Sequence, residues 1–153
     1  MRARLERRVE VAAPASVVWE YVTDWPQQGD WVPFTRVERL DAADGVGGRF
    51  RAWTGIGPVG FWDPMTITAW QRTPDGGGRC EVLHTGQVVR GEGEFAVQGR
   101  GDRACEFVWA EVVDVPLGRL GALGWKLAEP VVGRLIERAL STMRDLAERR
   151  SRD

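Results

Sequence analysis

The sequence predicts an α+β fold in which one long C-terminal helix covers an antiparallel sheet. Apolar residues recur at three- and four-residue steps from Pro116 to Arg150, which is the spacing of one helical face. Almost everything before Pro116 consists instead of runs with strand-like alternation, joined by short turns. Short turns join antiparallel neighbours, because parallel strands need crossovers of about a dozen residues or more. The long helix is the only element able to cover such a sheet.

Length and charge narrow the class of protein. The chain has 153 residues, so a single domain over residues 1–153 is expected. Its 21 Lys plus Arg nearly balance 22 Asp plus Glu, unlike the basic excess of nucleic-acid-binding proteins. No run approaches the ~18 apolar residues that span a bilayer, and the N-terminus lacks the apolar centre of a signal peptide. We therefore expect a cytoplasmic protein with no nucleic-acid partner and no stable membrane insertion.

The first elements are a strand at residues 5–12 and two short helices. Pro14 suits the first turn of a helix. That helix ends by Trp25, because the residue before a proline is pushed out of the helical region. A weaker helical turn is expected at residues 27–31.

Six more strands follow, each bounded by a turn. The clearest turn runs from Thr73 to Gly78, where Pro, Asp and Gly favour chain reversal. Gly60, Gly91 and Gly93 lie inside strands and permit the sheet to bend. The strands are predicted at residues 32–40, 49–54, 59–71, 79–89, 92–98 and 104–115.

The long helix is expected to bend near Pro130 and to turn its apolar face toward the sheet. The half after Pro130 is the better candidate for a continuous wall against the sheet. The apolar positions are Leu117, Leu120, Gly121, Gly124, Leu127, Ala128, Val131, Leu135, Ala139, Met143 and Leu146.

The whole pattern resembles the START-like (SRPBCC) superfamily, the helix-grip fold. The resemblance covers about Leu5 to Arg149, and the residues that carry it are VEVAAPASVVWEYVTDW near the start, the DPM at Asp63, HTGQVVRGEGEF from His84, and FVWAEVVDVPLGRLG from Phe107. Within the superfamily the chain is most similar to bacterial polyketide cyclase/dehydrase-like or lipid-transport-like proteins. The resemblance implies a curved antiparallel sheet of about seven strands around the long helix, with two short helices after the first strand.

The same resemblance implies a hydrophobic ligand cavity between sheet and helix, and hence a small hydrophobic molecule as partner. It leaves the activity open, because one fold serves many functions. The expected lining residues are apolar side chains on the inward strand and helix faces. They are Trp31, Phe61, Met65, Ile67, Val82, Phe95, Phe107, Trp109, Leu127, Val131, Leu135 and Ala139.

Three polar residues are the candidates for chemistry in that cavity. His84 is the single histidine and the one side chain whose ordinary pKa suits proton transfer near neutral pH. Asp63 stands in an apolar row, so its charge needs a partner, either His84 or an arginine at position 49, 51 or 90. Glu111 shares a face with two aromatic residues. If the three side chains meet, they suit proton removal beside a carbonyl, as in the cyclisation of a polyketone.

No metal or cofactor is expected. Cys80 and Cys105 share no metal-ligand spacing with His84. The glycines at 91 and 93 lead into another strand instead of a helix, so no helix N-terminus is available to hold phosphate.

Three functions remain open from the sequence. The first is a carrier or sensor that binds a small hydrophobic ligand. The second is an enzyme of the aromatase/cyclase type, a cofactor-free cyclase or dehydratase that uses His84 with Asp63 or Glu111 on a polyketide-like substrate. The third is an interaction module that dimerises through exposed Trp side chains, since the chain has eight Trp residues. Monomer and homodimer are both possible.

Overall fold

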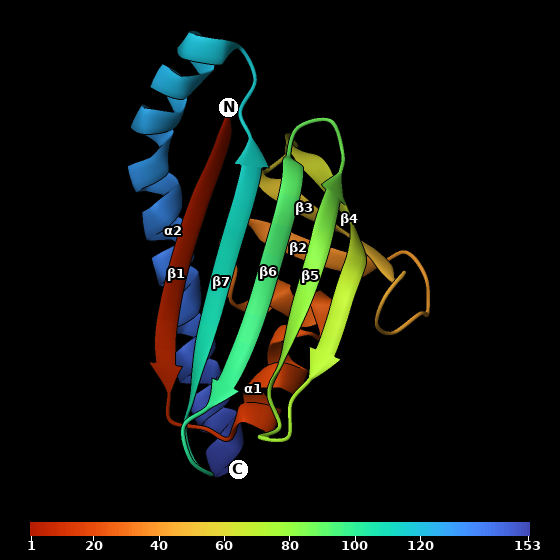
Figure 1. The fold of residues 1–153 in the computed structure, drawn as a ribbon, viewed down its shortest axis with the longest axis vertical. Coiled ribbons are helices and arrows are strands. Elements are labelled where there is room, and N and C mark those ends of the chain that lie inside the picture. The colour runs from red at the N-terminus through yellow and green to blue at the C-terminus, as the bar shows by residue number, and fades with distance from the viewer.

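Every neighbouring pair of strands is antiparallel, in the order β1-β7-β6-β5-β4-β3-β2. The computed structural model describes residues 1–153, and Figure 1 shows the sheet with the long helix beside β1. The predicted α+β class and helix-grip arrangement are confirmed. The elements are β1 (Arg2–Val11), α1 (Ala15–Val22), a 3-10 helix η1 (Trp25–Asp30), β2 (Thr35–Arg39), β3 (Arg49–Ile56), β4 (Val59–Arg72), β5 (Gly78–Thr85), β6 (Arg90–Gly99), β7 (Cys105–Asp114) and α2 (Gly118–Arg152).

The sheet is strongly curled, so that β2 and β3 cross behind β5 and β6 in Figure 1. A register shift between Ile67 and Ala69 marks an irregularity in β4 at the centre of this curl. A bulge of this kind bends a strand and increases its twist. The predicted strand at residues 79–89 ends early, at Thr85, and residues 86–89 form the loop that leads into β6.

The core fills one end of the concave face, beneath α1, η1 and the C-terminal half of α2. The ring of Trp25 stacks on Phe50 with 4.2 Å between centroids, and Trp31 meets Phe107 edge to face at 6.2 Å. All eight Trp side chains are buried or half-buried. The hypothesis of a Trp-built dimer face therefore lacks the exposed Trp side chains on which it depended.

The α2 helix runs without interruption through Pro130. The face that it turns toward the sheet is not the predicted one. Its buried residues all follow Pro130. They are Gly133, Ile136, Ala139, Leu140, Met143 and Ala147. In contrast, Leu117, Leu120, Leu127 and Val131 are between 61 and 75 % exposed. The prediction that these four residues face the sheet is wrong.

The reason is that α2 carries two apolar stripes. At about 100° of rotation per residue, the stripe containing Leu120, Leu127 and Val131 lies nearly opposite the stripe containing Ile136 and Met143. The inward stripe is the one with small residues, where the helix can approach the sheet closely. At Gly133, a Cβ atom would stand 2.6 Å from a guanidinium nitrogen of Arg7 on β1. Neither α2 nor any other helix combines the length and hydrophobicity needed to cross a membrane.

Candidate functional site

A cavity of about 550 Å³ lies between the concave face of the sheet and α2. Hydrophobic residues make up 20 of its 32 lining residues. Exposed side chains among the lining, including Val88, Arg90 and Pro116, place the opening at the loop before β6 and the start of α2. The cavity is therefore an apolar chamber that reaches solvent at the end of the sheet away from the core.

The structure divides the predicted lining residues into three groups. Trp31, Ile67 and Phe107 are at most 2 % exposed and belong to the core instead of the cavity wall. Leu127 and Val131 face solvent, because the outer stripe of α2 carries them away from the sheet. The rest line the cavity, and they are Phe61, Met65, Val82, Phe95, Trp109, Leu135 and Ala139.

The wall that α2 contributes was largely missed from the sequence. It consists of Trp125, Val132, Leu135, Ile136 and Ala139. The apolar residues 125, 132, 136, 139 and 143 recur at steps of seven, four, three and four, which also mark one helical face. That spacing is the signal that could have identified this second stripe.

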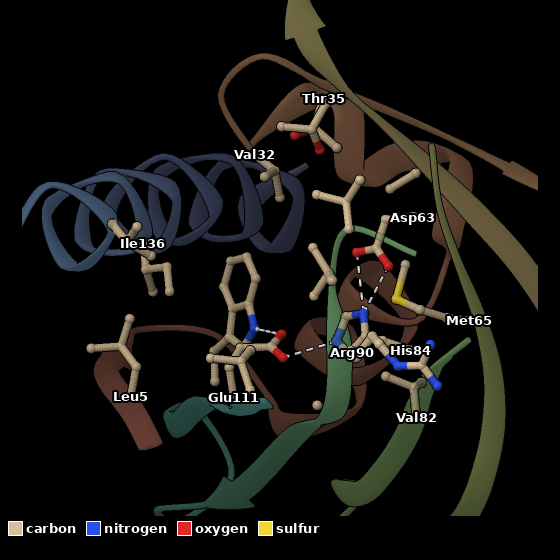
Figure 2. Close-up of a pocket in the computed structure, with 18 of the residues that line it drawn as sticks. Leu5, Val32, Thr35, Asp63, Met65, Val82, His84, Arg90, Glu111 and Ile136 are labelled. Atoms are coloured by element: carbon tan, nitrogen blue, oxygen red, sulfur yellow. Dashed lines mark hydrogen bonds and ion pairs between the residues drawn. The ribbon is translucent and has the colours of Figure 1, made fainter. Parts of the chain in front are cut away.

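Three polar side chains meet on the cavity wall, and we call Asp63, His84 and Glu111 the triad (Figure 2). Nδ1 of His84 lies 2.9 and 3.1 Å from the two carboxylate oxygens of Asp63. Nε2 lies 2.9 Å from Oε2 of Glu111. The other oxygen of Glu111 accepts a hydrogen bond of 2.8 Å from the indole N–H of Trp109. The two carboxylates thus hold the imidazole from two sides.

Strand alternation explains why the three side chains of the triad face inward. Two glycines on β6 explain how His84 and Glu111 come into contact. His84 on β5 and Glu111 on β7 are separated by β6, so their backbones are about 10 Å apart. The residues of β6 between them are Gly91, opposite His84, and Gly93, opposite Glu111. A Cβ atom on Gly93 would stand 3.0 and 3.1 Å from the carboxylate oxygens of Glu111. We call Gly91 and Gly93 the glycine gap, across which the imidazole and carboxylate make contact.

The charge state of His84 follows from its surroundings. Burial alone would lower the pKa of the imidazole, but the hydrogen bonds to Asp63 and Glu111 and the charges of both carboxylates outweigh burial and raise it to about 10. The side chain is therefore an imidazolium at neutral pH, with both N–H groups donating to carboxylates.

The partner of Asp63 is His84 and not an arginine. Arg49 pairs instead with Asp41, and Arg51 pairs with Glu38. Arg90 lines the cavity but lies in no ion pair. No group of three or more His, Cys, Asp or Glu side chains is arranged to hold a metal ion.

Comparison with known proteins places the chain in a family. Residues 2–148 match the family described as polyketide cyclase/dehydrase and lipid transport. No curated protein sequence matches the chain significantly.

Solved structures share the fold at low identity. The ZhuI aromatase/cyclase from Streptomyces sp. R1128 has a TM-score of 0.77 at 22 % identity, over 98 % of this chain and 96 % of that one. A START superfamily protein from Mycobacterium smegmatis has a TM-score of 0.66 at 17 % identity, over 97 % of both chains. Human STARD10 has a TM-score of 0.70 at 9 % identity, over 92 % of this chain and 62 % of that one. The fold, the cavity beneath α2 and the match over nearly the whole sequence lead to one conclusion: the chain belongs to the polyketide cyclase/dehydrase and lipid transport family.

Proposed function

We propose that this protein binds a small hydrophobic molecule in the cavity between the sheet and α2, as a carrier or sensor. The observation that supports it is the cavity itself, about 550 Å³ and mostly apolar. This volume falls within the range of about 300–1,000 Å³ that is usual for small-molecule sites. Such sites combine hydrophobic walls with a few polar groups that orient the ligand, and the triad is a polar group of this kind.

Filling the cavity tests the proposal. Thr54 on β3 lines the cavity, whereas Thr66 on β4 does not. Thr54→Trp is expected to weaken the binding of a hydrophobic probe at least about tenfold, or about 1.4 kcal/mol. Isothermal titration calorimetry with phenylbutanol measures this, and Thr66→Trp serves as the matched control. Equal binding by the Thr54→Trp variant and the natural protein would contradict a ligand site in this cavity.

A second candidate is an enzyme of the cyclase type, and the convergence of the triad favours it. In an aldol-type cyclisation, Glu111 would take a proton from the carbon beside a carbonyl, and the enolate would attack a second carbonyl. The imidazolium of His84 would then protonate the resulting alkoxide, which leaves carboxyl and imidazole groups to exchange the proton. Glu111 is the carboxylate that a substrate reaches more easily, because its side chain is 19 % exposed, against 12 % for Asp63.

The arrangement also sets a requirement for this second candidate. Both N–H groups of His84 already donate to carboxylates, so a carbonyl oxygen must displace one carboxylate to reach the acid. His84→Ala is expected to lower turnover of a cognate polyketone by about 10²–10⁴-fold if the residue is a general acid. Product analysis by mass spectrometry measures turnover, and unchanged turnover removes the role of the histidine. A carrier returns the polyketone unaltered.

A further inference from the structure

The triad places more negative than positive charge on the cavity wall. It contains two carboxylates and one imidazolium, so with all three ionised it carries one net negative charge. Its side chains are between 5 and 19 % exposed, so water screens this charge only weakly. An uncompensated charge in a buried site is costly unless a partner meets it.

No other side chain of the cavity supplies that partner. Two further acids of the lining are already neutralised, Glu94 by Arg79 and Asp114 by Arg2. Arg90 is the single Arg or Lys of the lining, and it is exposed near the opening. Neither carboxylate of the triad lies within ion-pair distance of any Arg or Lys. The missing positive charge is therefore not provided by the protein.

The hydrogen-bonding capacity that the triad has left consists of acceptors. Both N–H groups of His84 and the indole N–H of Trp109 already donate to carboxylates. The carboxylate oxygens retain acceptor capacity, because an ionised carboxylate offers about four lone-pair sites. The triad itself therefore accepts hydrogen bonds and has no free N–H donor. A ligand ammonium fits the triad, whereas a ligand carboxylate or carbonyl finds no donor there.

From these observations we propose that the cavity is selective for a hydrophobic molecule bearing a positively charged amine, which ion-pairs with Asp63 and Glu111. This inference rests on the proposed function, because it concerns the ligand of the same cavity.

Three probes of matched size and different charge test the inference: phenylbutylamine, phenylbutanol and phenylbutyrate. Isothermal titration calorimetry at neutral pH is expected to give a dissociation constant for the amine at least about tenfold lower than for the alcohol. Phenylbutyrate is expected to bind most weakly. Equal or tighter binding of the alcohol or the acid overturns the inference.

Two variants locate the charge that is responsible. Glu111→Gln and Asp63→Asn each remove one negative charge, so the advantage of the amine over the alcohol is expected to fall to about threefold or less. Glu92→Gln removes a carboxylate that is 62 % exposed and is the matched control, in which the advantage is expected to persist. Persistence of the full advantage in both triad variants overturns the inference.

The outcomes separate the two proposals. Binding of all three probes with equal affinity would retain the ligand cavity and overturn selection by charge. Binding of none of them would overturn both. Circular dichroism checks that each variant is folded. If neither triad variant folds, the order of the three probes on the natural protein decides the question.

Discussion

At the scale of single residues, the site depends on two glycines, which have no side chain, as much as on the triad itself. Gly93 lies between Val82 and Glu111 on the neighbouring strands, and its empty side holds the Glu111 carboxylate. The sequence suggested only that this glycine lets the sheet bend. Its position in the glycine gap gives it a second role, which is to let groups two strands apart make contact.

Gly93→Ala is expected to lower the free energy of unfolding by about 1–3 kcal/mol, the usual cost of overpacking. The added methyl group would stand about 3 Å from Glu111 and 3.1 Å from Cγ2 of Val82, so one of them must move. Urea denaturation measures the change. Gly124→Ala is the control, because a Cβ atom there meets nothing within 4 Å. A Gly93→Ala variant as stable as the natural protein would show that Glu111 has room to spare.

The charge on His84 predicts how stability depends on pH. Its pKa is raised from the ordinary value of 6.5 to about 10, so the folded protein holds this proton more tightly than the unfolded chain. The stabilisation is fully present below about pH 6.5 and is lost as the pH rises through about 10. Urea denaturation from pH 6 to pH 10 should show a fall in stability that His84→Asn lacks. A histidine titration near pH 6.5 by NMR would refute the prediction.

The residues of the triad could be predicted, but their contacts could not. Asp63, His84 and Glu111 each alternate with polar or outward positions on a strand, and a period of two is enough to place them on one face. Which strands are neighbours, and in which register, depends on pairings across the whole sheet. The sequence therefore left Asp63 with four candidate partners, and only the register of β4 with β5 identifies His84.

At the scale of elements, α2 shows where periodicity reaches its limit. Three- and four-residue spacing correctly predicts a helix, and it does so for two stripes at once. The stripe of large leucines is the more conspicuous in the sequence, yet the stripe with Gly133 and Ala139 packs against β1 and the core. Which stripe is buried depends on how closely it can pack and not on the size of its side chains. Close packing in turn depends on the shape of the sheet surface that the helix meets.

A matched pair of substitutions on α2 checks which stripe is buried. Leu140 is 2 % exposed, and Leu140→Ala is expected to cost about 2–5 kcal/mol because it leaves a cavity in the core. Leu127 is 74 % exposed, and Leu127→Ala should change stability by no more than about 0.5 kcal/mol. Both values come from urea denaturation. Comparable losses in the two variants would mean that the outer stripe is covered.

At the scale of the whole molecule, the concave face has a packed end and a hollow end. The packed end receives α1, η1 and the C-terminal half of α2, with Trp19 and Met143 at most 1 % exposed. The hollow end is bounded by the N-terminal half of α2, the start of β6 and the turn of chain around Pro33. Element order and turn lengths predict the architecture, whereas the size of the cavity depends on how far the sheet curls, which they do not encode.

A ligand bound in the hollow end should raise the stability of the folded protein. A molecule that binds only the folded protein adds about 2.7 kcal/mol to the free energy of unfolding at a free concentration of 100 times its dissociation constant. Phenylbutylamine at that concentration is therefore expected to raise the melting temperature measured by calorimetry. Thr54→Trp should reduce the rise at the same probe concentration. A rise of equal size in that variant would place the probe elsewhere on the protein.

The glycine gap has a consequence for anyone who redesigns this pocket. Gly91 has a φ of 134° and would place a Cβ atom 2.0 Å from the carbonyl oxygen of Val112, so the backbone itself forbids a side chain there. A combinatorial library that randomises every inward position would lose most of its members at 91 and 93. One that keeps these two positions as glycine and varies Phe61, Met65 and Val82 can change the specificity of the protein while the polar site stays assembled.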